Sequence, residues 1–244
     1  MNIRIACTTL KKRPAVMVPF AIFALMEIYL LYNMFIPSKM PGYGAVVFVY
    51  LPERAPLITM AIVSVLVFPL TFGITPSIAE GKTFRDSVLT ALHNYLNMIC
   101  AALMGTFSLA TAAFFLLRIF GKSLVMNIFD ITPSYVIFYS FIGFLLILVS
   151  VFLIYIPPGV IRSGSIRGFF HSFTFAAENY AKSFLALIIP LTMILVSFFL
   201  LVIIPFMIPL DIAWIRLFTV LFSVFSTVPL TLLGLIPSFE YMKG

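Results

Sequence analysis

Six long apolar segments alternate with short polar stretches along the chain. Each is close to the roughly 20 residues that an α-helix needs to cross the ~30 Å hydrocarbon core of a bilayer. The predicted spans are Ala15–Ile36, Pro56–Thr75, Tyr95–Phe120, Tyr135–Ile156, Ser183–Ile208 and Ile215–Pro237. The pattern therefore predicts an all-α integral membrane protein, with one transmembrane domain over residues 1–244.

The composition supports the same conclusion. Hydrophobic residues make up 63% of the chain and charged residues only 9%, whereas a soluble domain is typically about 25% charged. The first apolar segment follows a basic stretch, as in a signal peptide. At 22 residues it is longer than an apolar signal core of about 7–15 residues, and no small-residue cleavage site follows it. We therefore expect a retained first span.

The placement of Lys and Arg predicts the orientation. With six spans and a cytoplasmic N-terminus, ten basic residues fall inside and five outside, and cytoplasmic loops are the ones that carry excess Lys and Arg. The inner set is Arg4, Lys11, Lys12, Arg13, Lys82, Arg85, Arg162, Arg167, Lys182 and Lys243, and the outer set is Lys39, Arg54, Arg118, Lys122 and Arg216. The sequence predicts a cell-membrane protein with both termini in the cytoplasm.

Two inner loops show helical periodicity. Phe84–Tyr95 and Phe169–Tyr180 each place apolar residues on one face and polar residues on the other. This pattern is typical of an amphipathic helix at the membrane surface. In the first outer loop, the apolar run Ala45–Leu51 is too short to span, and we expect it to dip into the interface or to pack over the bundle.

The two inner loops also resemble each other. At an offset of 85 residues, six positions between Phe84 and Leu103 are identical: Phe84, Ser87, Ala91, Asn94, Tyr95 and Ala101 match Phe169, Ser172, Ala176, Asn179, Tyr180 and Ala186. The alternative is a chance match among abundant residue types. We predict a parallel internal duplication, with residues 56–120 and 135–208 as the repeats.

The recurring Gly81…Ser87…Ala91…Asn94-Tyr95 pattern, seen again from Gly164 to Tyr180, resembles a broad group of prokaryotic multi-pass membrane families. One member is the membrane domain attached to some glycerophosphodiester phosphodiesterases. The resemblance covers about half the chain and implies a fold of repeated span, interfacial helix and span units. It implies no activity, because no phosphodiesterase domain is present.

Glu27 is the strongest break in the apolar pattern, because it lies near the middle of the first predicted span. A carboxylate at that depth costs at least ~2.5 kcal/mol on insertion scales. Hydroxyls at similar depth are its expected partners: Thr106, Ser108, Ser197, Ser226 and Thr227. Two interpretations stay open, a proton or cation site and a hydrogen bond that holds helices together.

The sequence contains no catalytic motif. Zinc-protease HExxH, the G-x-S-x-G elbow, the P-loop and GxGxxG are all absent. We therefore expect no enzyme, no cofactor and no metal. The net charge of +7 comes from scattered residues rather than a basic stripe, so it predicts contact with the lipid bilayer and no nucleic-acid partner.

Two functional hypotheses remain. The chain is either a permease-like transport component or a non-catalytic structural or scaffolding subunit of a membrane complex. In both cases the inner helices are the expected contact for a partner protein, either an ATPase or another complex subunit.

Overall fold

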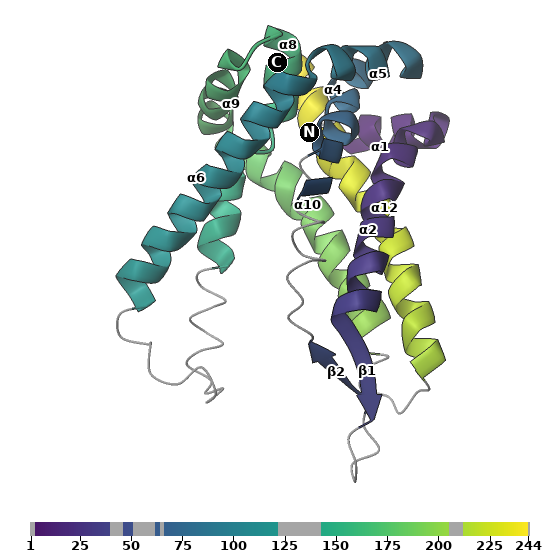
Figure 1. Ribbon diagram of the computed structural model, residues 1–244. Coiled ribbons are helices and arrows are strands. Elements are labelled where there is room, and N and C mark those ends of the chain that lie inside the picture. The colour runs from purple at the N-terminus through teal and green to yellow at the C-terminus, as the bar shows by residue number, and fades with distance from the viewer. Residues whose placement is uncertain are drawn as a thin grey trace.

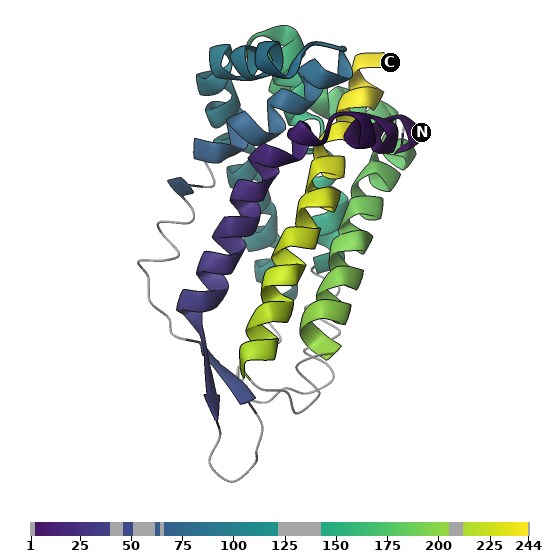
Figure 2. The same ribbon diagram turned by 90° about the vertical axis from the view of Figure 1, so that its right-hand side faces the viewer.

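Short helices and both chain termini gather at one end of a bundle of longer helices (Figures 1 and 2). We call this the short-helix end. The computed structural model describes residues 3–39, 46–50, 62–63, 66–121, 143–204 and 212–243. Among these residues every regular element is a helix, apart from one hairpin of two strands. The expected all-α class therefore holds in outline.

The chain begins with a short helix that leads into a long one. Helix α1 (Ile3–Lys12) is followed by the 3-10 turn η1 (Pro14–Met17) and by α2 (Val18–Met34). A proline at the first position of η1 suits a helix start, since its fixed φ is already helical and its missing N–H would have no partner there.

The first predicted span is two residues too long. Its last residues, Phe35 and Ile36, belong to strand β1 (Phe35–Lys39), which pairs antiparallel with β2 (Val46–Tyr50). Proline at position 37 disfavours a helical conformation at Ile36, and the valines of β2 suit a strand. Most of the apolar run Ala45–Leu51, namely Val46–Tyr50, thus lies in a hairpin, while the first and last residues of the run lie outside the described residues.

Two chain segments have the same succession of elements. The first contains residues 66–72, α4 (Ile74–Ala79), α5 (Phe84–His93) and α6 (Tyr95–Gly121). The second contains residues 143–150, α8 (Ile156–Ser163), α9 (Arg167–Glu178) and α10 (Tyr180–Phe198). Helix α10 continues into the π-helical turn η2 (Phe199–Ile203), and α12 (Ile212–Lys243) completes the described chain.

Several predicted boundaries are wrong. The fourth span was expected to reach Ile156, but residues 151–155 form turns and Ile156 starts α8. The fifth span was expected to begin at Ser183, but its helix α10 begins three residues before that, at Tyr180. The sixth was expected to end at Pro237, yet α12 continues to Lys243. Both prolines of α12 lie inside the helix, where tertiary packing can offset the lost hydrogen bond.

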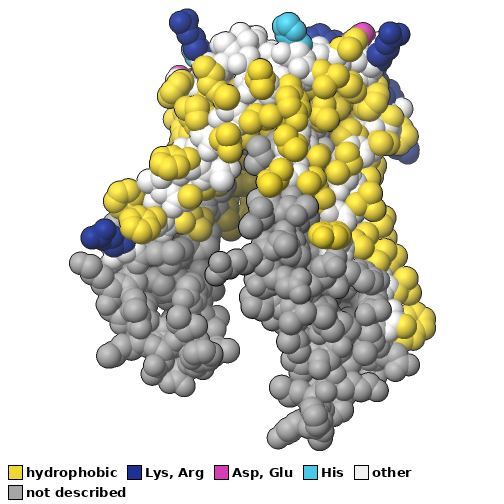
Figure 3. All heavy atoms as spheres, in the orientation of Figure 1, with side chains coloured by type: hydrophobic (Ala, Val, Ile, Leu, Met, Phe, Trp, Pro, Cys, Tyr) yellow, Lys and Arg dark blue, Asp and Glu magenta, His cyan; other side chains and the backbone are white. Residues whose placement is uncertain are grey.

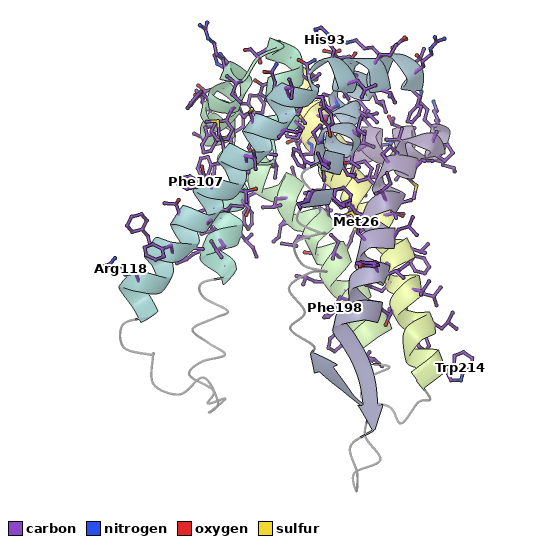
Figure 4. The ribbon with its side chains drawn as sticks, in the orientation of Figure 1. Met26, His93, Phe107, Arg118, Phe198 and Trp214 are labelled. Atoms are coloured by element: carbon purple, nitrogen blue, oxygen red, sulfur yellow. The ribbon has the colours of Figure 1, made fainter. Side chains whose placement is uncertain are left out.

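Three described helices are long and apolar enough to cross a membrane. They are Tyr95–Phe115, Tyr180–Leu201 and Leu217–Met242, and the described parts of the first and second predicted spans form shorter apolar helices. On the face shown in Figure 3, apolar side chains cover the described flanks, while Lys and Arg project mainly at the short-helix end. Phe107 and Trp214 point away from the bundle (Figure 4). This is the surface of a membrane protein.

Helix α12 is the centre of the packing. It lies against α2 and α10 along the bundle and against α4, α8 and α1 at the short-helix end. The core cluster there joins Val16, Ile78 and Ala91 to Leu235 and Phe239 of α12. The largest cluster of buried hydrophobic residues therefore lies where the short helices meet α12.

The two short amphipathic helices pack on the bundle largely through small residues. In α5 the buried residues are small, Ser87 and Ala91, while Phe84 and Leu92 are exposed. In α9 the buried stripe includes Gly168, Ser172 and Ala176. Small residues allow close backbone approach. Phe169 of α9 is buried beside them, whereas Phe170 of α9 is exposed.

Candidate functional site

Glu27 and its expected partners lie on four helices. The backbone of Glu27 lies in α2, but its side chain lies outside what the structure describes, so the intramembrane polar site stays a prediction. On α6, the Thr106 hydroxyl donates to Ala102 O at 2.9 Å and the Ser108 hydroxyl to Met104 O at 2.8 Å. Thr106 is exposed and Ser108 half-buried.

The other expected partners lie nearer the packed core. Ser197 is half-buried on α10, whereas Ser226 and Thr227 are buried on α12, which packs against α2. The Ser226 hydroxyl donates to Ser223 O at 2.8 Å and the Thr227 hydroxyl to Val224 O at 2.7 Å. The structure thus brings the helix of these two residues beside the helix of Glu27.

A row of buried hydroxyls runs along α12. Its members are Thr219, Ser223, Ser226, Thr227, Thr231 and Ser238. Most donate to carbonyls of their own helix; Thr231, for example, donates to Thr227 O. Ser238 also reaches Thr75 Oγ1 of α4 at 3.1 Å. Own-helix bonds satisfy a hydroxyl without water, so the row can be buried in an apolar bundle.

Close to the end of this row, α12 carries a buried carboxylate. Glu240 is 8% exposed. The hydroxyl of Tyr155, at the start of α8, donates to its Oε2 at 2.8 Å. Ser183 of α10 lies beside the same hydroxyl. Among the described residues Oε1 has no hydrogen-bond partner, which is costly for a buried carboxylate oxygen.

A basic side chain lies next to this pair. The Arg162 guanidinium of α8 donates from Nη1 to Tyr241 O at 3.0 Å and lies 5.8 Å from the centre of the Tyr241 ring. Tyr241 in turn packs against the rings of Tyr155 and Phe175. The site therefore joins α8 to α12 through one carboxylate, two tyrosines and one arginine, and Phe175 of α9 and Ser183 of α10 lie beside them.

A buried carboxylate with a hydroxyl donor can hold a proton or a cation, or it can join helices. In the part of the chain that the structure describes, no three His, Cys, Asp or Glu side chains lie close enough together to hold a metal ion.

Glu240 was not identified from the sequence, because the sixth span was predicted to end at Pro237. A usable signal was present. The apolar residues Leu232, Leu235, Ile236 and Phe239 follow helical spacing past this proline, which predicts a helix that carries Glu240 with it.

The matched loops have matching backbone geometry. Gly81 and Gly164 both have positive φ, 89° and 62°. Further on, Asn94 and Asn179 each interrupt the helix, and each side-chain amide donates to the carbonyl four residues earlier, at 3.0 and 3.2 Å. Both breaks redirect the chain from a short helix into a long one. The same residue types therefore perform the same local tasks in both segments.

No family model, curated protein or solved structure matches this chain. The resemblance noted for the repeated Gly…Ser…Ala…Asn-Tyr pattern accordingly stays a prediction.

Proposed function

We propose that the chain is a non-catalytic membrane subunit that binds a cytoplasmic partner protein through α5. One observation carries the proposal. Helix α5 is held to the bundle by the small residues Ser87 and Ala91, and it leaves Leu89 and Leu92 exposed beside Arg85 and His93. Exposed leucines rimmed by charged and polar residues are typical of protein interfaces.

The position of α5 favours a protein rather than lipid as the occupant of this face. Helix α5 lies farther out along the bundle axis than α1 (Figures 1 and 2). The last turn of α1 carries Lys11 and Lys12, which are suited to the level of the lipid headgroups. Leucines beyond that level cannot reach the acyl chains, so a second protein is the better partner.

The proposed subunit has six spans and both termini in the cytoplasm. Supporting this, both chain ends lie at the short-helix end (Figure 1), as an even number of spans requires. Basic residues of α1, α8 and α9 lie there too, including Lys11, Lys12, Arg162 and Arg167. The matched glycines and asparagines support a parallel duplication of residues 56–120 and 135–208.

Site-specific photocrosslinking in cells tests the partner. A crosslinking residue at Leu89 is expected to give a discrete protein adduct, and one at Phe107, an exposed position in a predicted span, to give none. The double variant Leu89→Asp, Leu92→Asp should abolish the adduct formed from a neighbouring position, without lowering the melting temperature in detergent. Adducts of equal intensity at Leu89 and Phe107, or no protein adduct at Leu89, would reject the proposal.

A transport component is the second candidate. It is supported by the buried hydroxyl row of α12 and by Oε1 of Glu240, which has no hydrogen-bond partner within the described part of the chain. In this case Glu240→Gln and Glu27→Gln would abolish proton or cation flux into proteoliposomes that contain a pH-sensitive dye, while leaving thermal stability intact. Wild-type proteoliposomes that carry no flux above empty vesicles would reject it.

A further inference from the structure

A pocket of about 310 Å³ lies where the chain turns from α1 into α2. It combines two cationic side chains with an apolar lining. The residues around it are Lys12, Arg13, Pro14, Ala15, Val16, Ile78 and Phe84. Neither the proposed partner face of α5 nor the buried Glu240 site accounts for this pocket.

The charge in the pocket is positive. Lys12 and Arg13 are exposed, and the Arg13 guanidinium donates from Nη1 to Lys82 O at 2.9 Å, which fixes it against the loop before α5. The nearby acids have other partners: Glu80 forms an ion pair with Lys82 at 2.8 Å, and the Asp86 carboxylate accepts from Thr83 Oγ1 at 2.6 Å. The pocket is therefore complementary to an anion.

The apolar part of the pocket continues toward the predicted membrane interior. Pro14 and Ala15 form the exposed rim, and the next exposed residues at helical spacing are Val18, Ile22 and Leu25. Val18 is 64% exposed and Leu25 65% exposed. They form one apolar strip along α2 that starts at the two cations. A cationic group at the headgroup level above an apolar strip matches an amphiphile with an anionic head.

We propose that this pocket binds one molecule of anionic phospholipid, with its phosphate between Lys12 and Arg13 and an acyl chain along Val18, Ile22 and Leu25. The phosphate of a lipid is chosen over free phosphate because the apolar strip continues directly from the cationic rim. Arg13 offers the fork of N–H donors that suits phosphate, and Lys12 adds a point charge. Bound lipid would fix the angle between α1 and α2.

Native mass spectrometry of the purified full chain in detergent tests this. Phosphatidylglycerol is expected to bind more tightly than phosphatidylcholine. Lys12→Gln should weaken phosphatidylglycerol binding about five-fold, the loss expected for one basic contact near a membrane surface. The matched control is Lys11→Gln, which removes the same charge one residue away and outside the pocket lining, and should change the affinity less than two-fold.

Three results would overturn the proposal. Equal losses in Lys12→Gln and Lys11→Gln would mean diffuse surface attraction rather than a pocket. Equal binding of phosphatidylcholine would remove the anionic requirement. Displacement of the lipid by millimolar inorganic phosphate would assign the pocket to a free anion. Val18→Asn tests the apolar strip on α2. This variant should weaken lipid binding without changing how inorganic phosphate affects the bound lipid. Unchanged lipid binding in Val18→Asn would contradict the proposed path of the acyl chain.

Discussion

Glu240 stabilises the short-helix end only while its carboxylate accepts the hydrogen bond from Tyr155. The two residues lie 85 positions apart and meet through one hydrogen bond of 2.8 Å, which links the start of α8 to the end of α12. A buried carboxylate that loses its donor bears the full cost of its own desolvation. This single contact should therefore contribute more to stability than the own-helix hydroxyl bonds of α12.

Removing the Tyr155 hydroxyl is expected to destabilise the protein. Tyr155→Phe keeps the ring but deletes the donor to Glu240, and should lower the free energy of unfolding by about 1–3 kcal/mol, measured as a fall in melting temperature in detergent. Tyr180→Phe is the control, because Tyr180 is partly exposed and its ring contact with Phe152 survives the change. Adding Glu240→Leu to Tyr155→Phe should recover much of the loss. Equal effects of Tyr155→Phe and Tyr180→Phe would contradict this role.

Single residues show what the sequence could and could not reveal about the candidate site. Glu27 is visible as a charge in an apolar run, and hydroxyls can be counted at any depth. The partner of Glu240 cannot be found this way, since it depends on how α8 and α12 meet. The burial of Glu240 also required α12 to continue past Pro237, which tertiary packing permits and local propensity disfavours.

At the scale of elements, two glycines set the turns of the matched segments. Gly81 and Gly164 adopt positive φ, and a Cβ added to either would meet no atom within 4 Å. Backbone conformation alone therefore requires glycine there. Gly159 and Gly168 are different, because a Cβ on either would collide with the backbone of the other. The contact between α8 and α9 thus depends on both being glycine.

Alanine substitutions at the two glycines with positive φ test the effect of backbone strain without a steric clash. Gly164→Ala and Gly81→Ala are each expected to reduce the free energy of unfolding by about 1–2 kcal/mol through left-handed strain alone. Gly143→Ala is the control, since Gly143 lies in a helical stretch with open space around it and no positive φ; it should be neutral or slightly stabilising. Thermal unfolding of the three variants is the measurement. A loss for Gly143→Ala as large as for Gly164→Ala would exclude backbone strain as the cause.

Periodicity predicted the elements better than their ends. The amphipathic helices expected over Phe84–Tyr95 and Phe169–Tyr180 are present as α5 and α9, and long helices were expected to begin near Tyr95 and Ser183. The apolar pattern did not identify Ser87, Ser172 and Ala176 as buried residues, because it was judged by apolar side chains. Hydrophobicity cannot show which stripe is buried when lipid or a partner can cover the other one.

In the whole molecule, the charged side chains and the short helices are concentrated at the same end. The described Lys and Arg side chains lie mostly at the short-helix end (Figure 3), with Arg118 near the opposite end of α6 (Figure 4). Charged residues cluster where spans leave the hydrocarbon, and an excess of Lys and Arg marks the cytoplasmic side. The proposed partner face and the proposed lipid pocket both lie at this end, and the partner face requires that this end faces the cytoplasm.

Cysteine labelling decides that orientation. The free thiols Cys7 and Cys100 are first replaced by serine, and single cysteines are then placed at Ser123 or Ser165. Ser165 lies between α8 and α9 at the short-helix end, so a membrane-impermeant maleimide should label it only after the cells are opened. Ser123 lies outside the described residues, in the loop after the third predicted span, and should react in intact cells.

A cysteine at Leu89 of α5 extends the test to the proposed partner face. This face must be accessible from the cytoplasm, as Ser165 is expected to be. The reverse pattern would place the short helices outside the cell, and a cytoplasmic partner could then not reach α5.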